Sequence, residues 1–163
     1  MKRTIILLVL LFLGTACTVG PVVEYQRNQL DYDSEVHVAP LRADWQLEEA
    51  RMALSAWTYA TGDSFRFALM SSPGGARWSI DGGELDGVSG VARRETREIV
   101  VDWDNGQGAW EMVLLHELGH AIGLGHMPGT LMDANTGIPC IDQETIDTAC
   151  DLRGCAERRT TCQ

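Results

Sequence analysis

One eleven-residue segment, residues 116–126, most constrains what this chain can fold into. It reads His-Glu-Leu-Gly-His-Ala-Ile-Gly-Leu-Gly-His. His116 and His120 are four residues apart, so on a helix their rings project from the same face, one turn apart. Because imidazole nitrogens suit a tetrahedral zinc ion, this spacing predicts that the two side chains take two corners of a zinc site. The segment therefore predicts a helix that presents metal ligands on one side.

Three further residues of the segment complete the predicted site. Glu117 is adjacent in sequence to a ligand but is not needed as one, so its carboxylate is placed to take a proton from a zinc-bound water. A continuing helix would carry His126 away from the metal. Gly123 can adopt the positive φ with which many helices end, so the chain can fold back and bring the third imidazole to the ion. The fourth corner is then left for solvent.

The spacing His116-Glu117-x-x-His120-x-x-Gly123-x-x-His126 resembles the signature of the metzincin clan of zinc endopeptidases. Downstream, Met132 matches the methionine that in this clan forms a hydrophobic floor beneath the zinc. Within the clan the chain is most similar to the matrixins, the matrix metalloproteinase family. That similarity rests on residues 56–59 and 65–67, near the end of the first helix and the start of the first strand, and on residues 141–154, near the final helix. Met127 departs from the matrixin pattern, which has serine there.

The resemblance implies an α+β fold with a metzincin-like catalytic domain. In such a domain a twisted mixed β-sheet packs on two long helices, and a small C-terminal subdomain contains the methionine turn and a final helix. It also implies one catalytic Zn²⁺, a polypeptide substrate and hydrolysis of peptide bonds. The peptide would lie extended along a sheet edge, for which residues 87–93 are the candidate, and residues 133–139 would line the pocket beside the metal.

Hydrophobic periodicity predicts the remaining elements. Apolar residues recur at helical spacing after Asp44 until residues 61–63, and again from about Gly108 to Gly123. Alternating or β-rich segments between these helices predict short strands. The predicted strands span residues 65–69, 76–80, 87–93 and 98–103.

The N-terminus predicts export. Lys2 and Arg3 precede an apolar run too short to span a bilayer, so residues 1–16 have the layout of a secretory signal of the lipoprotein type. Cys17 would then carry the lipid and anchor the protein to a membrane surface, facing the periplasm or the cell exterior. Residues 17–43 are expected to be a lipid-anchored tether leading into the domain, and residues 44–162 to form the domain itself. Ordinary signal peptidase cleavage, without lipid, is the alternative.

Cysteine usage agrees with an oxidising compartment. Setting Cys17 aside for lipid leaves four cysteines near the C-terminus, an even set that predicts two disulfides. The four allow three pairings, and the sequence does not choose among them. The candidates are Cys140, Cys150, Cys155 and Cys162.

Charge narrows the classes of partner. The chain has a formal net charge of −10, which disfavours nucleic acid and anionic lipid as partners. Asp81, Glu84 and Asp86 lie in a glycine-rich loop that could hold Ca²⁺, since this ion prefers several oxygen ligands. The loop does not match a helix-loop-helix calcium motif, and solvated turn carboxylates are the favoured interpretation.

Two functions fit these residues. The first is a zinc endopeptidase. The second is a non-catalytic surface lipoprotein or binding module that retains zinc for folding or recognition. Glu117 favours the first, because a purely structural zinc site has no use for a neighbouring carboxylate and usually closes its fourth position with a protein ligand.

Overall fold

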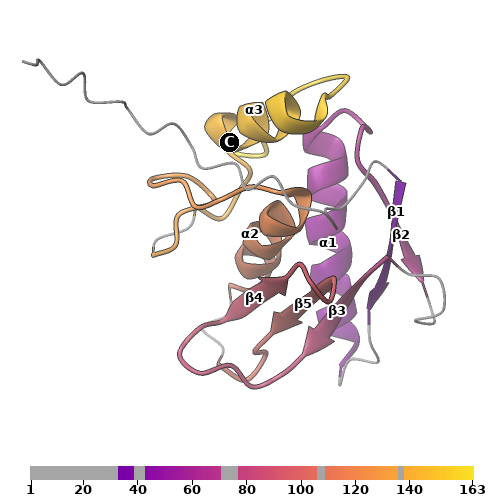
Figure 1. Cartoon of the computed structure of the whole chain (residues 1–163), viewed down its shortest axis with the longest axis vertical. Coiled ribbons are helices and arrows are strands. Elements are labelled where there is room, and N and C mark those ends of the chain that lie inside the picture. The colour runs from indigo at the N-terminus through magenta and orange to yellow at the C-terminus, as the bar shows by residue number, and fades with distance from the viewer. Residues whose placement is uncertain (1–32, 39–42, 71–76, 106–108, 136–137) are drawn as a thin grey trace, which may run out of the picture.

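The computed structural model describes residues 33–38, 43–70, 77–105, 109–135 and 138–163. Their elements combine one β-sheet with three helices in a mixed α+β fold (Figure 1). The predicted signal segment, Cys17 and most of the predicted tether lie outside the described residues. Among those residues, no helix has both the length and the apolar character needed to cross a membrane.

The sheet has five strands in the order β2-β1-β3-β5-β4. β1 runs parallel to β2 and β3, β3 runs parallel to β5, and β4 pairs antiparallel with β5. This places β4 at one edge of the sheet, as the sequence analysis expects for the strand within residues 87–93. The strands are β1 (Asp33–Val38), β2 (Arg66–Met70), β3 (Trp78–Gly82), β4 (Gly90–Arg93) and β5 (Glu98–Val101).

β1 is a strand that the sequence analysis does not predict, because it places residues 33–38 in the tether. This segment has only two apolar residues, Val36 and Val38, so its alternation is weak. It forms a strand by pairing with β2 and β3, both of which follow it in the chain. Such pairing depends on tertiary context more than on local propensity. The sheet therefore begins before Asp44, the expected start of the domain.

Two helices form most of the core with the sheet. α1 (Asp44–Ala60) and α2 (Trp110–Ile122) pack against each other, α1 also contacts β2, and α2 also contacts β4 and β5. The buried Trp57 side chain of α1 donates a hydrogen bond from Nε1 to the Leu115 carbonyl of α2, at 3.0 Å. This bond satisfies the indole N–H and fixes how the two helices lie against each other.

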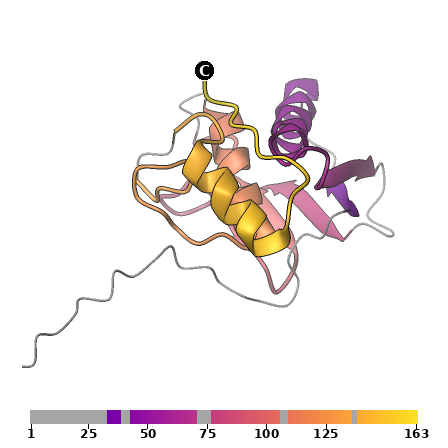
Figure 2. The same ribbon diagram turned by 90° about the horizontal axis from the view of Figure 1, so that it is seen from above.

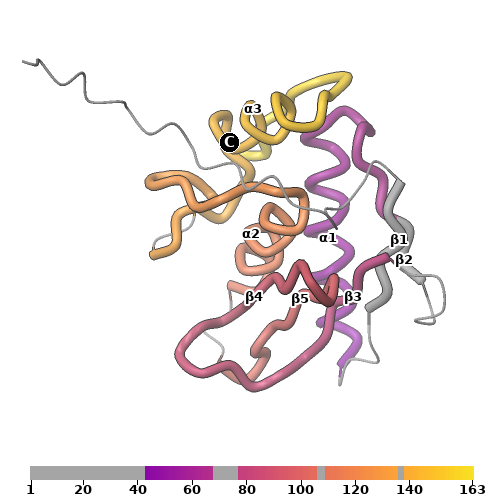
Figure 3. The backbone as a smooth tube through the Cα atoms, in the orientation of Figure 1, coloured from indigo at the N-terminus to yellow at the C-terminus, as the bar shows by residue number. Residues whose placement is uncertain are grey.

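The third helix, α3 (Gln143–Arg153), lies beyond the upper ends of α1 and α2 in Figure 1, and in the view from above it lies in front of α2 (Figure 2). It begins at Asp142, whose Oδ1 accepts a hydrogen bond from the Thr145 N–H at 3.0 Å, an N-cap that satisfies a free helix donor. The chain between α2 and α3 loops out beside α2 (orange in Figure 3). It carries His126 and Met132, so this segment and α2 together build the site.

Candidate metal centre

The site begins with the way α2 is packed. Its apolar side chains are buried against α1 and the sheet, which turns the opposite side of the helix toward a cleft. His116 and His120 lie on that side, one helical turn apart, and both line the cleft. The buried apolar residues of α2 are Leu114, Leu115, Leu118, Ala121 and Ile122.

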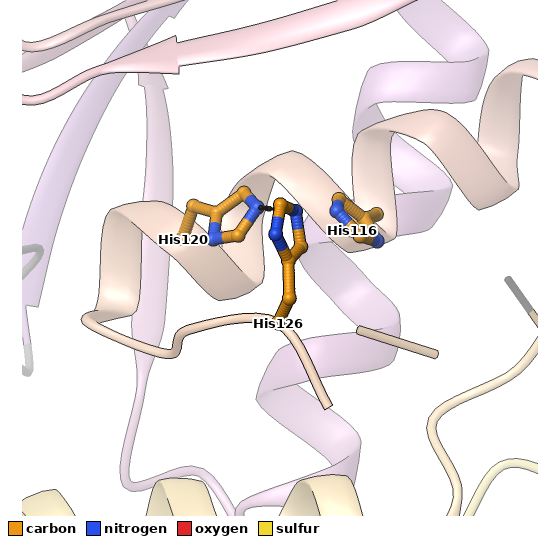
Figure 4. A group of neighbouring side chains, drawn as sticks. All are labelled: His116, His120 and His126. Carbon is orange, nitrogen blue, oxygen red and sulfur yellow. Dashed lines mark hydrogen bonds between the residues drawn. The ribbon is translucent and has the colours of Figure 1, made fainter. Parts of the chain in front are cut away.

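Gly123 ends α2 and redirects the chain. Its φ of 122° lies in a region that favours glycine, and its N–H donates to the carbonyls of Gly119 and His120. Three residues later, His126 faces the two helical histidines (Figure 4). Among the described residues, His116, His120 and His126 form a group whose ligand atoms all lie within 4.8 Å of one another, so the group could bind a metal ion.

Two of these rings are oriented by backbone carbonyls. The Nδ1 atoms of His116 and His120 lie 2.8 Å from the carbonyl oxygens of Leu131 and Leu124. A carbonyl can only accept, so each Nδ1 carries the proton and each Nε2 keeps a free lone pair. Metal-binding histidines are commonly oriented in this way, with the second ring nitrogen donating to a carbonyl.

The spacing of one pair of ring nitrogens fits a small tetrahedral ion. The Nε2 atoms of His120 and His126 are 3.2 Å apart (Figure 4). Two nitrogens that bind one tetrahedral zinc at about 2.0–2.1 Å lie about 3.3 Å from each other. Without an ion the same contact can be a hydrogen bond donated by His126. The all-imidazole donor set and this distance therefore fit Zn²⁺.

Burial keeps the helical histidines neutral. Burial, with smaller contributions from the nearby His116, His126 and Arg94, lowers the pKa of His120 to about 4, although a hydrogen bond to the Leu124 carbonyl opposes this change. Burial likewise lowers the pKa of His116. A metal ligand must be a neutral imidazole, so these environments favour the binding form at neutral pH.

Glu117 lines the same cleft and is only 7% exposed. Burial raises the pKa of its carboxyl to about 7, while a hydrogen bond from the Ala92 backbone opposes this rise. A carboxyl with a pKa near neutrality suits a general base, and a divalent cation beside it would favour the ionised form. The structure thus places the predicted base within the cleft that the three histidines line.

Met132 is fully buried beside α2. A Cβ atom built on Gly119 would meet the Met132 sulfur and lie 3.5 Å from the Trp57 ring, so only glycine leaves room for this packing. The Met132 carbonyl accepts a hydrogen bond from the Met127 N–H at 2.9 Å, which closes the turn after His126. Met132 therefore packs against the ligand-bearing helix at Gly119, which lies between His116 and His120 in the sequence.

Replacing Gly119 by Ala should destabilise the fold by about 1 kcal/mol, because overpacking costs about 1–3 kcal/mol and the gain in helix propensity offsets about 1 kcal/mol of that cost. In a Met132→Val background, which removes the crowding sulfur, the same change should be neutral or stabilising. Urea denaturation of the four metal-free proteins measures this coupling. An equal cost in both backgrounds would show that Met132 does not crowd Gly119.

The sequence analysis misses two residues that support the site. Asp142 accepts a hydrogen bond from the Leu131 N–H at 2.8 Å, and the Leu131 carbonyl in turn orients His116. Arg94 donates to the carbonyls of His120 and Leu124. Asp142 precedes a helix, which is a recognisable N-cap signal, but its second bond is not local. No sequence pattern indicates the partners of Arg94.

Two disulfides stabilise the C-terminal part. Cys140 pairs with Cys162 and Cys150 pairs with Cys155, which selects one of the three pairings left open by the sequence. Disulfides persist in oxidising compartments, so both bonds indicate an extracellular or exported protein. The Cys140–Cys162 bond joins the C-terminal end of the chain to a position two residues before Asp142.

The cleft has a volume of about 1010 Å³. One wall is β4 with the residues before it, from Gly87 to Ala92, and the opposite wall includes residues 133–135. In the loop for which calcium was the less favoured interpretation, the Asp81 carboxylate accepts a hydrogen bond from the Ser79 hydroxyl at 2.7 Å. Within the described part of the chain, Asp81, Glu84 and Asp86 do not form a close group of metal-binding side chains.

Comparisons with known proteins identify no family. No family model and no curated protein matches this sequence. A solved structure of myroilysin resembles the fold with a TM-score of 0.47 and 13% sequence identity, over 64% of this chain and 52% of that one. The chain therefore aligns with about half the length of that protein.

Proposed function

We propose that this protein is a zinc-dependent endopeptidase of the metzincin clan, with the matrixins as its nearest family. One observation carries the proposal: His116, His120 and His126 face one another in a cleft that also contains the buried carboxyl of Glu117. The motif resemblance supports the same function, and the packing of Met132 on Gly119 is compatible with the methionine turn of that clan.

In this proposal the histidines hold Zn²⁺ and Glu117 moves the proton. Zinc bound by three protein ligands supplies Lewis acidity and lowers the pKa of water to about 7. Glu117 accepts the proton of the attacking water and returns it to the departing amine. The carbonyls of Leu131 and Leu124 keep the rings of His116 and His120 in their binding orientation. No covalent intermediate with the protein is required.

The edge strand β4 supports a polypeptide as the substrate. Among the described strands, β5 is the only partner of β4, and the other side of β4 forms a wall of the cleft. An extended peptide could add to this edge with backbone hydrogen bonds and pass the zinc site. Residues 133–135 on the opposite wall would then contact its side chains.

Export and anchoring complete the proposal. Residues 1–16 would act as a signal, Cys17 would carry lipid, and the domain, with β1 included, would lie outside the cytoplasm on a membrane surface. The two disulfides support export. Lipid attachment is proposed from the sequence around Cys17 and from the even number of cysteines that remain when Cys17 is set aside.

Incubating the zinc-loaded full chain with a diverse peptide pool tests the proposed activity. We expect internal cleavage, detected by mass spectrometry, that stops when zinc is chelated and is absent from a His120→Ala variant. Elemental analysis of the same samples should give one zinc per chain. A protein that binds one zinc and cleaves no peptide would instead be the non-catalytic zinc-containing binding protein.

A further inference from the structure

Arg94 directly follows β4 and is only 8% exposed. Burying a guanidinium costs free energy unless its donors are satisfied, so the hydrogen bonds of such a residue show what it holds in place. Its neighbour Arg93 is different. Arg93 pairs with Glu98 at 3.0 Å on the surface, with 48% of its side chain exposed.

The partners of Arg94 lie at the end of the ligand-bearing helix. Nε donates to the His120 carbonyl at 3.1 Å, and Nη2 donates to the Leu124 carbonyl at 3.3 Å. The last carbonyls of a helix lack intrahelical donors, and a positive charge is favourable at this end of the helix dipole. Arg94 therefore contacts the backbone on both sides of Gly123, at His120 before it and at Leu124 after it.

One of these carbonyls also orients a candidate metal ligand. The Leu124 oxygen accepts from Nδ1 of His120 at 2.8 Å as well as from Arg94. Leu124 is in addition only two residues before His126. A displacement of this carbonyl would rotate the His120 ring and shift the backbone that carries His126.

The same segment also contacts the candidate base. The Ala92 backbone, two residues before Arg94, donates a hydrogen bond to the Glu117 carboxylate. The end of β4 thus contacts α2 at Glu117 and at its C-terminal turn. Only Arg93 lies between these two contacts in the sequence. Together they connect the cleft wall formed by β4 to α2, the helix that carries His116 and His120.

We propose that Arg94 is a positioning residue of the metal centre, which fixes the Leu124 carbonyl and thereby the approach of His120 and His126 to one ion. This inference rests on the proposed zinc site. Two carbonyls are bound by two nitrogens of one planar group, an arrangement that the single ammonium of lysine cannot reproduce. Arg94 also lines the cleft, but in this role it acts through the Leu124 carbonyl and not by contact with the ion.

The test compares Arg94→Met and Arg94→Lys with Arg93→Met as the matched control. Zinc affinity is measured by competition with a chromophoric chelator, and Co²⁺ is used as a spectroscopic probe of ligand geometry. We expect Arg94→Met to weaken zinc binding by about 10–100-fold, the usual effect of removing a group that orients a ligand. Arg94→Lys should be intermediate with an altered Co²⁺ spectrum, and Arg93→Met should stay within about twofold of wild type.

Urea denaturation of the metal-free proteins separates positioning from stability. If Arg94→Met lowers only the free energy of unfolding and keeps wild-type zinc affinity and Co²⁺ spectrum, the proposal is wrong. If that variant does not fold, Arg94→Lys decides, and wild-type affinity and spectrum in it would also overturn the proposal. These measurements need no substrate, so a wild-type protein that binds zinc but cuts no peptide would refute the peptidase function alone.

Discussion

Replacing Glu117 by Gln should lower kcat/KM for peptide hydrolysis by about 10²–10⁴-fold, the contribution typical of a positioned general base. The amide has nearly the same size and can still accept the hydrogen bond from Ala92, but it cannot take a proton from water. The histidines and their carbonyl partners are unchanged, so zinc should bind with near wild-type affinity. Activity measured together with zinc content checks both parts of this expectation.

Glu95→Gln is the matched control, because Glu95 lines the same cleft and is exposed. It removes the same charge from the cleft wall without removing a buried base. Its effect on kcat/KM should stay within a few-fold, as expected for an exposed charge screened by solvent. Cleavage by Glu117→Gln at the wild-type rate would remove Glu117 from the mechanism.

The ligand-bearing part of the fold could be predicted because its signals are local. The apolar periodicities of α1 and α2 extend over many residues, and both helices lie where the sequence predicts them. The fold-back after α2 was predictable from Gly123, whose φ is positive in the structure. His116, His120 and His126 meet for the same reason, because only nine residues lie between the first and the last in the sequence.

Residues that act over longer separations escaped prediction. Arg94 reaches the carbonyls of His120 and Leu124, which lie 26 and 30 residues away. β1 pairs with strands that follow α1, and its own sequence is mostly polar. Neither feature produces a periodic pattern in the sequence, because tertiary packing determines which residues become partners. The role of the buried Arg94 side chain can be inferred only when the carbonyls that accept its hydrogen bonds are known.

The disulfide pairing could not be predicted for a related reason. Cysteine spacing limits loop lengths, but the geometry of α3 and the tail decides which sulfurs meet. Cys150 and Cys155 lie at the C-terminal end of α3 and just after it, whereas Cys162 returns to Cys140 before the helix. The tail is held there by Thr161, whose N–H donates to the Ile141 carbonyl at 2.9 Å. The two bonds therefore have different surroundings.

Removing the Cys140–Cys162 bond by replacing both residues with Ala should lower the free energy of unfolding by about 3 kcal/mol, from the loop entropy released over a separation of 22 residues. The Cys150–Cys155 bond closes a separation of 5, for which the same model gives about 2 kcal/mol. Urea denaturation of the metal-free double variants under non-reducing conditions measures both costs.

Loss of the two disulfides should differ more in its effect on zinc affinity than in its effect on the free energy of unfolding. Cys140 is next to Ile141, which exchanges hydrogen bonds with Thr161, and Asp142 then holds Leu131, whose carbonyl orients His116. Loss of the Cys140–Cys162 bond frees the tail from this segment, so zinc binding should weaken measurably. The Cys150→Ala/Cys155→Ala variant leaves these contacts intact and serves as the control. Equal zinc affinity in both variants would show that the tail stabilises the fold without supporting the metal centre.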